Sequence, residues 1–121
     1  MPRFCFALDL KNDANLIWHY KALHQQGSVP PAVARSFVRA GIGSLEIYCV
    51  RNRLFMVIEA NGDFDLNAAT GSDSEAIDIR AWEALMERFQ QPLPGARQGE
   101  KWMAAETIYR FDQTMPLLAK K

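Results

Sequence analysis

The segment SLEIYCVRNRLFMVIEA, residues 44–60, decides the fold. It divides into two runs of alternating side chains, residues 44–50 and 53–60, with only Arg51 and Asn52 between them. Apolar side chains at every second position are typical of β-strands, and so short a connection joins antiparallel neighbours. The segment therefore predicts a β-hairpin. The apolar side chains expected to share one face are Leu45, Ile47 and Cys49 in the first strand and Leu54, Met56 and Ile58 in the second.

The chain on either side adds two strands and three helices to the hairpin. Alternating apolar side chains predict strands over residues 3–10 and 102–112. Apolar stripes at helical spacing predict helices over residues 14–26, 31–40 and 73–90. The order β-α-α-β-β-α-β, with the two early helices counted as one interrupted crossover, is the split β-α-β pattern of a ferredoxin-like α+β fold.

Capping signals mark the ends of the predicted helices. Asp13 suits the N-cap of the first helix, and Ser72 with Glu75 suits a capping box for the third. Pro31 suits the first turn of the second helix, and Gly41 suits the position just after its end. The side chains expected on the inner stripes are Val33, Phe37 and Ala40 in the second helix and Ile77, Ala81, Leu85 and Phe89 in the third.

The length and charge of the chain limit its class. A length of 121 residues suits one domain, expected over residues 1–112, with a C-terminal tail over residues 113–121. Lys plus Arg and Asp plus Glu each number 14, so the formal net charge is zero. Since nothing in this balance attracts a polyanion, neither nucleic acid nor a membrane surface is expected as a partner.

Features near the N-terminus and the two cysteines predict a cytoplasmic location. Asp9 and Lys11 interrupt the early apolar run, so a signal peptide is not expected. No stretch approaches the roughly 18 apolar residues that a membrane span needs. Cys5 and Cys49 lie in predicted strands without CxxC spacing, which favours reduced, structural thiols.

Both faces of the predicted strands carry apolar side chains. Helices on one side of a four-stranded sheet leave its other face open to water, where apolar side chains are unfavourable. The pattern therefore predicts a homodimer whose open sheet faces meet or enclose a cavity.

The stretch HYKALH, residues 19–24, contains both histidines of the chain. Tyr20 and His24 are four residues apart and share one helix face, where they can exchange hydrogen bonds with a polar ligand. The alternative is a core tyrosine with a satisfied hydroxyl beside a surface histidine. His19 points to another face and is expected to be solvated, so the two histidines are not expected to share a metal.

A second group of candidates lies near the C-terminus. Glu100 and Lys101 stand next to Trp102 at the start of the last predicted strand, and Trp82 adjoins the core stripe of the third helix. Aromatic faces pack against the C–H side of a sugar while polar groups bind its hydroxyls. The alternative is a salt bridge beside a buried tryptophan. Motifs for phosphate-binding loops, serine hydrolases and zinc enzymes are missing, so no cofactor or metal is expected and proton transfer or simple binding remains.

Taken together, these features resemble the L-rhamnose mutarotase family, and more closely its L-fucose branch. The likeness rests on the opening strand, on Y-x-x-x-H from Tyr20 to His24, on GSVPPAV at residues 27–33, on the hairpin, and on AWEALMERFQQPLPGARQGEKW at residues 81–102. It implies a dimeric ferredoxin-like α+β barrel that needs no cofactor. It implies interconversion of the α and β anomers of a 6-deoxy-hexose, with L-fucose favoured over L-rhamnose.

The resemblance also implies roles for individual residues. His24 is the expected general acid, with Tyr20 as its partner. One group protonates the ring oxygen while another takes the proton of the anomeric hydroxyl, after which the sugar opens, rotates and closes on the other face. The residues expected to bind the substrate are Trp82, Met86, Glu100, Lys101, Trp102 and Phe64.

One departure from the family pattern keeps alternatives open. The family usually carries Trp-Pro-Glu where this chain has Pro30, Pro31 and Ala32. Retained activity is expected because His24 and Tyr20 are present. The alternatives are a non-catalytic dimeric protein of the same fold that binds a sugar or another metabolite, and another enzyme of the same superfamily, such as a monooxygenase-like protein.

Overall fold

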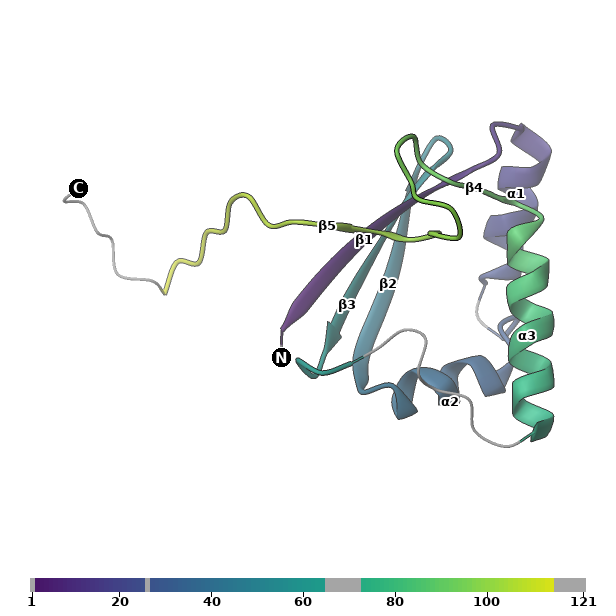
Figure 1. The fold of residues 1–121 in the computed structure, drawn as a ribbon, viewed down its shortest axis with the longest axis horizontal. Helices are drawn as coiled ribbons and strands as arrows, with labels where there is room; N and C mark the ends of the chain where they lie inside the picture. The colour runs from purple at the N-terminus through teal and green to yellow at the C-terminus, as the bar shows by residue number, and fades with distance from the viewer. Residues whose placement is uncertain (1, 26, 65–72, 115–121) are drawn as a thin grey trace.

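The computed structural model describes residues 2–25, 27–64 and 73–114 of the chain. Within them, three helices lie on one side of one curved antiparallel sheet (Figure 1). The elements are β1 (Arg3–Leu10), α1 (Ala14–Leu23), α2 (Pro31–Arg39), β2 (Ile42–Val50), β3 (Arg53–Ala60), α3 (Asp73–Glu87), β4 (Gln90–Gln91) and β5 (Met103–Ala105). None of the described helices is long and apolar enough to cross a membrane.

The sheet has the strand order β2-β3-β1-β4, and β5 also pairs with β1. β3 occupies one edge of β1 from Arg3 to Asp9. β4 and β5 share the other edge, where β4 pairs with Asp9 and Leu10 and β5 pairs with the segment from Cys5 to Ala7. The loop over residues 92–102 therefore leaves the sheet and returns to it along the same strand.

The predicted hairpin is confirmed. β2 and β3 pair antiparallel up to Val50 and Arg53, and Arg51 turns the chain with a φ of 55°. The turn is fixed to the end of β1, because the amide nitrogen of Leu10 donates to the carbonyl oxygen of Asn52 at 2.6 Å and Asn52 Nδ2 donates to the carbonyl oxygen of Leu10 at 3.0 Å. β1 and the hairpin thus form one hydrogen-bonded unit.

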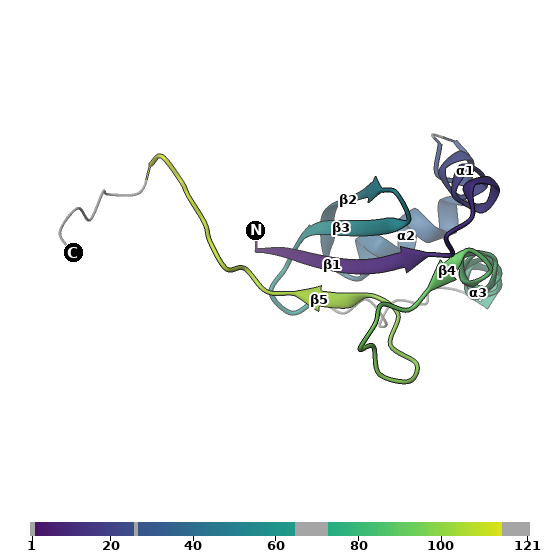
Figure 2. The same ribbon diagram turned by 90° about the horizontal axis from the view of Figure 1, so that it is seen from above.

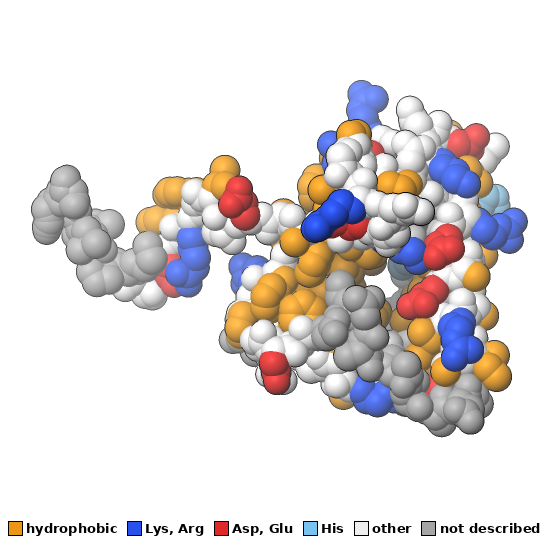
Figure 3. All heavy atoms as spheres, in the orientation of Figure 1, with side chains coloured by type: hydrophobic (Ala, Val, Ile, Leu, Met, Phe, Trp, Pro, Cys, Tyr) orange, Lys and Arg blue, Asp and Glu red, His pale blue; other side chains and the backbone are white. Residues whose placement is uncertain are grey.

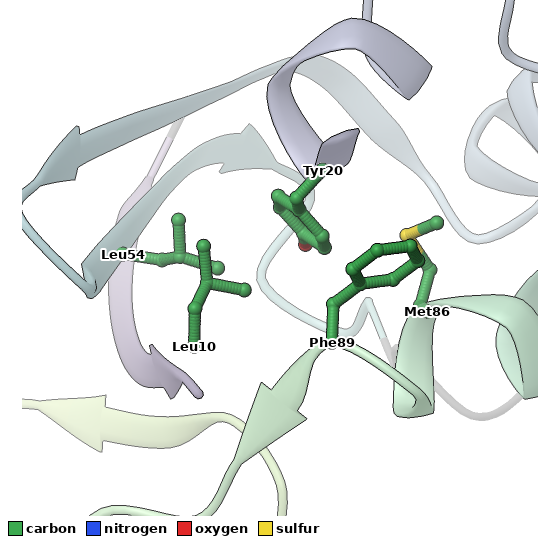
Figure 4. Packing of buried hydrophobic residues seen from close by; sticks show 5 residues of the cluster. All are labelled: Leu10, Tyr20, Leu54, Met86 and Phe89. Carbon is green, nitrogen blue, oxygen red and sulfur yellow. The ribbon is translucent and has the colours of Figure 1, made fainter. Parts of the chain in front are cut away.

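The two faces of the sheet differ as the alternation predicts. Leu54, Met56 and Ile58 are buried on the inner face, toward the helices, whereas Tyr48 and Val50 are exposed on the outer face. One buried cluster joins Leu10, Tyr20, Leu54, Met86 and Phe89 (Figure 4). A second joins Ile42, Met56, Ile58 and Ala60. Burying a large apolar side chain contributes about 1.5–3 kcal/mol, so these clusters hold the helices to the sheet.

The helix ends agree largely with the capping signals. Asp13 Oδ1 accepts a hydrogen bond from the amide nitrogen of Leu16 at 3.0 Å, which confirms the predicted N-cap. Pro31 opens α2, and Gly41 follows its end with a φ of 88°. α1 and α3 are each three residues shorter at the C-terminal end than predicted. Ser72, the first half of the predicted capping box, lies outside the described residues.

The predicted core stripe of α3 is wrong at its N-terminal end. Ile77 is 63% exposed and Ala81 is also exposed. The side chains that turn inward are instead those of Ile79, Trp82 and Met86. These positions repeat at the helical period of 3.6 residues and leave Ile77 on the water side.

The predicted last strand is also too long. Of the predicted range, only residues 103–105 pair with β1. The last pair joins Ala105 to Cys5, and β1 begins only two residues before Cys5, so little of it remains to pair. Residues 106–112 then run past the end of the sheet as an arm without regular hydrogen bonding (Figures 1 and 2). Residues 115–121 of the predicted tail lie outside the described part of the chain.

Candidate functional site

Tyr20 projects from α1 into the core. Its side chain is 3% exposed and lies beside Met86 and Phe89, whose ring centroid is 5.9 Å away (Figure 4). Gln90 Nε2 donates to its hydroxyl oxygen at 3.4 Å. Burial raises the pKa of Tyr20, since an ionised phenol is poorly solvated there. The hydroxyl therefore stays protonated at neutral pH.

His24 is half-buried at the C-terminal end of α1, one turn after Tyr20. The two rings are tilted against each other with centroids 4.3 Å apart. His24 Nδ1 lies 2.7 Å from the carbonyl oxygen of Tyr20. Because a carbonyl oxygen only accepts, Nδ1 carries the hydrogen and donates it, which leaves Nε2 as the basic nitrogen of the neutral imidazole.

Trp82 of α3 lies beside His24. Its ring meets that of His24 edge-on, with centroids 5.4 Å apart. Met86, one turn further along α3, is 6% exposed and packs in the core beneath Tyr20. Sequence spacing placed Tyr20 and His24 together, and the fold adds Trp82 to them.

Trp102 and Phe64 lie along the inner face of the sheet. Trp102 is half-buried and packs against both core clusters. Phe64 packs against the second cluster, with its ring centroid 4.5 Å from that of Phe4. Trp102 therefore bridges the group around Tyr20 and the group around Phe64.

Glu100 and Lys101 have partners of their own. Glu100 Oε1 accepts a hydrogen bond from the amide nitrogen of Arg97 at 3.0 Å, inside the loop over residues 92–102. Lys101 Nζ lies 2.5 Å from Glu87 Oε2 at the end of α3. The hydrogen bond and charge of Lys101 lower the pKa of Glu87. The ion pair ties the loop to α3 beside Trp102.

Two concave regions lie on opposite sides of the sheet. Apolar side chains gather over the inner side of the sheet, and the surface is hollowed between them and α3 (Figure 3). A depression of about 530 Å³ lies on the outer face, among strand residues that include Arg3, Glu46 and Glu59. Trp102 packs against both core clusters and His24 contacts the rings of Tyr20 and Trp82, so the imidazole of His24 lies on the inner side with the helices.

Sequence reasoning missed two residues of this region. Gln90 was expected at the end of a helix, yet it begins β4 and binds the hydroxyl of Tyr20. Glu87 was not among the candidate residues; it is exposed and pairs with Lys101. The paired glutamines after the helix were a faint signal for Gln90. The alternative interpretation of a salt bridge beside Trp102 anticipated an ion pair here, but it did not identify Glu87 as the partner of Lys101.

The departure from the family pattern lies at the start of α2. Ala32 is 2% exposed and packs inside, while Pro31 occupies the first helical turn. No side chain at these positions offers an acid or a base. The carboxylate that the family pattern carries here is therefore replaced by part of the apolar core.

Comparisons with known proteins identify the family of this chain. The sequence matches the L-rhamnose mutarotase family over residues 3–111. It is 42% identical over 115 residues to an L-fucose mutarotase from Xanthomonas campestris pv. campestris, covering 95% of this chain and 92% of that protein. It is 34% identical over 110 residues to a UPF0734 protein from Dictyostelium discoideum, covering 88% of this chain and 86% of that protein.

A solved structure has the same fold. The crystal structure of an L-rhamnose mutarotase from Formosa agariphila superposes with a TM-score of 0.63 at 19% identity, covering 93% of this chain and all of that one. The expected α+β architecture is therefore present in an independently solved relative.

Proposed function

The chain belongs to the L-rhamnose mutarotase family, and we propose from this that it is an isomerase that interconverts the α and β anomers of a 6-deoxy-hexose. L-fucose is the favoured sugar, since the similar protein from Xanthomonas campestris pv. campestris is an L-fucose mutarotase. L-rhamnose is the second candidate. The reaction needs no cofactor, and we place it in the cytoplasm, where Cys5 and Cys49 remain as free thiols.

The arrangement of His24 carries this proposal. With Nδ1 engaged by the carbonyl oxygen of Tyr20, the imidazole is held in one tautomer and its Nε2 is the atom that exchanges protons. Protonated Nε2 gives its proton to the ring oxygen as the bond from the anomeric carbon to that oxygen breaks. The anomeric hydroxyl loses its proton to water, and the free aldehyde turns before the ring closes again.

Tyr20 acts as the partner of His24. Its phenol is buried and its pKa is raised, so it is unsuited to the role of a base. Its ring supports the imidazole at a centroid distance of 4.3 Å, and its carbonyl oxygen fixes the tautomer. The proposed role is therefore one of positioning His24.

Aromatic side chains are proposed to form the sugar-binding wall. Trp82 contacts His24, and Trp102 continues the apolar surface toward Phe64. Such a surface, backed by Met86, suits the C–H face and the 6-methyl group of the sugar. Glu100 and Lys101 lie beside Trp102 and are proposed to bind sugar hydroxyls. To do so, Glu100 would release the amide of Arg97 or Lys101 would release Glu87.

We propose further that one ferredoxin-like domain, residues 1–112, forms a homodimer. The antiparallel strand order β2-β3-β1-β4 supports the fold assignment. Tyr48, Val50 and Phe55 on the outer face of the sheet are 54%, 61% and 36% exposed, which supports a partner on that side.

Saturation-transfer proton NMR tests the activity. One anomeric proton is irradiated and the other is observed for equilibrated L-fucose, L-rhamnose and D-galactose. The wild-type protein should transfer saturation with a 6-deoxy sugar, and His24→Ala should reduce the exchange rate by about 10²–10⁴-fold. His19→Ala is the matched control, because His19 lies exposed on the same helix against Trp18.

Two outcomes count against the proposal. Equal rates for the wild type and His24→Ala would remove His24 from the mechanism. Thermal stabilisation by a sugar without anomer exchange would favour the alternative, a non-catalytic sugar-binding protein of the same fold.

A further inference from the structure

Gln90 places a side-chain amide among apolar neighbours. It begins β4, it is half-buried, and its Nε2 donates to the hydroxyl oxygen of Tyr20 at 3.4 Å. The buried cluster around Tyr20 includes Leu10, Met86 and Phe89. A polar group in such surroundings is costly unless its hydrogen bonds are satisfied. The amide is therefore expected to have a partner besides Tyr20.

The hydrogen bond to Tyr20 leaves most of this amide free. A glutamine side chain has two N–H donors and a carbonyl oxygen that accepts. Among the hydrogen bonds of the described residues, the one to Tyr20 is the one in which the side chain of Gln90 takes part. At 3.4 Å it is longer than a typical hydrogen bond, so it restrains the amide only weakly. One N–H and the carbonyl oxygen Oε1 can therefore bind a ligand.

The strand register places Gln90 on the inner side of the sheet, near Trp102. Gln90 is the partner of Leu10 in β1, and directly opposite residues of paired strands point to the same face, which at Leu10 is the buried one. Trp102 packs against the core clusters on that side and comes directly before Met103, whose partner in β1 is Ala7. Gln90 and Trp102 are thus neighbours along one edge of β1, although a long loop separates them in the sequence.

Tyr20 connects Gln90 to His24. The imidazole of His24 packs against the ring of Tyr20 with centroids 4.3 Å apart, whereas Gln90 binds the hydroxyl at the far end of the same side chain. The proton-transfer group and the amide therefore lie at different points along Tyr20, and Trp102 lies beside the amide.

We propose that Gln90 is a specificity-determining residue of the proposed reaction, whose side-chain amide binds a sugar hydroxyl on the side of the ring away from His24. The inference rests on the proposed function, in which His24 acts at the ring oxygen. The hydroxyls opposite the ring oxygen are those of carbons 2, 3 and 4. L-fucose and L-rhamnose differ in configuration at carbons 2 and 4.

The chemistry of an amide suits this discrimination. Its donor and its acceptor have fixed directions, so a hydroxyl in one configuration is bound and the same hydroxyl in the other configuration is not. A site that hydrogen-bonds a hydroxyl discriminates far more strongly than an apolar wall does. Oε1 of Gln90 can accept at once, whereas Glu100 and Lys101 must first release part of their present contacts.

Gln91 supplies the matched control. It follows Gln90 in β4, pairs with Asp9 and is exposed, and strand alternation turns it to the outer side. Gln90→Leu and Gln91→Leu each remove one amide from the same strand with little change in side-chain size. Circular dichroism establishes that both variants are folded, and Gln90→Met replaces Gln90→Leu if leucine prevents folding.

Saturation-transfer NMR at several sugar concentrations gives kcat/KM for L-fucose and L-rhamnose. The wild type should prefer one of the two sugars. Gln90→Leu should lower kcat/KM about tenfold for the preferred sugar and less than about threefold for the other, because a hydrogen bond to one configuration is lost. Gln91→Leu should keep the wild-type preference. A wild type without a preference, an unchanged preference in Gln90→Leu, or an equal loss for both sugars would overturn the proposal.

Tyr20→Phe separates contact with the sugar from support of the fold. This substitution removes the hydrogen bond between Tyr20 and Gln90 but keeps the amide. The ratio of kcat/KM for the two sugars should therefore stay at its wild-type value. If Tyr20→Phe changed that ratio as much as Gln90→Leu does, the hydrogen bond and not the sugar contact would explain the effect, and the proposal would be wrong.

Equilibrium binding distinguishes this inference from the proposed activity. Isothermal titration calorimetry measures the Kd of L-fucose and of L-rhamnose for the wild type and the Gln90 variant. Binding with a preference that depends on Gln90, but without anomer exchange, would remove the activity and leave this inference standing. Anomer exchange that is independent of Gln90 would do the reverse. A wild type that neither binds nor exchanges either sugar would overturn both.

Discussion

Substitution of Tyr20 by Phe separates the ring of this residue from its hydroxyl. The hydroxyl is buried and has a single protein partner among the described residues, Gln90 Nε2 at 3.4 Å. A neutral hydrogen bond of that length is weak, and a typical one contributes about 0.5–1.5 kcal/mol. Gln90 is only half-buried, so its freed amide can bind water. The expected loss is therefore about 0.5–1 kcal/mol, or roughly 3–5 °C in the unfolding temperature.

The same substitution should leave anomer exchange nearly unchanged. Phenylalanine keeps the ring beside His24, and the carbonyl oxygen that accepts from Nδ1 belongs to the backbone. Tyr20→Ala, by contrast, removes the ring from a cluster with Leu10, Leu54 and Phe89. Truncating a buried aromatic residue in this way costs about 3–5 kcal/mol.

Urea unfolding and saturation-transfer NMR on the same samples check both expectations. The Phe variant should unfold at a slightly lower urea concentration and exchange L-fucose within about threefold of the wild-type rate, because a positioning ring is retained. A folded Tyr20→Phe protein that had lost anomer exchange would refute the reasoning. The hydroxyl would then act on the sugar itself, despite its burial.

Three further substitutions test the loop, a helix end and a cap. Lys101→Met should lower the unfolding temperature near neutral pH but not below about pH 3, as measured by thermal melts over a pH series. The pKa of Glu87 is lowered by Lys101, so the ion pair stabilises the fold above the ordinary carboxyl pKa, and this stabilisation is lost as the pH falls and Glu87 becomes protonated. Gly41→Ala should cost about 1–2 kcal/mol in urea unfolding, since its φ is 88° and the added Cβ lies 3.1 Å from a side-chain amide nitrogen, whereas Gly62→Ala, with open space around it, should be nearly neutral. Asp13→Ala should cost about 1 kcal/mol in the same assay by removing the N-cap of α1, and an unchanged midpoint would show that the cap is dispensable.

The hairpin was predictable because its signal is local. The two alternating runs on either side of Arg51 and Asn52 define strands, faces and register without reference to the rest of the chain. The N-cap at Asp13 and the helix end at Gly41 were predictable for the same reason, since each depends on the conformation of one residue and its near neighbours.

The errors concern contacts between distant segments. Ile77 is as apolar as the true core residues of α3, and only the direction from which the sheet packs decides that Trp82 turns inward instead. The short β4 exists because Gln90 meets the end of β1, a contact across most of the chain. The last strand stops at Ala105 because β1 offers little further length to pair with. Periodicity carries none of this information.

Part of the candidate site was predictable on similar terms. The helical spacing of Tyr20 and His24 places them on one face, and both alternatives read from that spacing hold in part. Tyr20 is a core residue with a hydrogen-bonded hydroxyl, as the alternative interpretation expected. His24 is half-buried rather than fully exposed, and Trp82 of α3 contacts one side of its ring. That contact required the fold.

The change to Pro30, Pro31 and Ala32 bears on which groups can move protons in the proposed reaction. Ala32 is 2% exposed, so this position turns into the core at the start of α2, where an unpaired carboxylate is costly. Around His24 the neighbouring rings are those of Tyr20 and Trp82. The indole does not titrate, and burial raises the pKa of the phenol. In the proposed reaction the imidazole is therefore the group of this aromatic cluster assigned to proton transfer, and the second proton of ring opening passes to water. A site built in this way depends on holding Nε2 of His24 in place, which is what the contacts to the carbonyl oxygen of Tyr20 and to the two rings do.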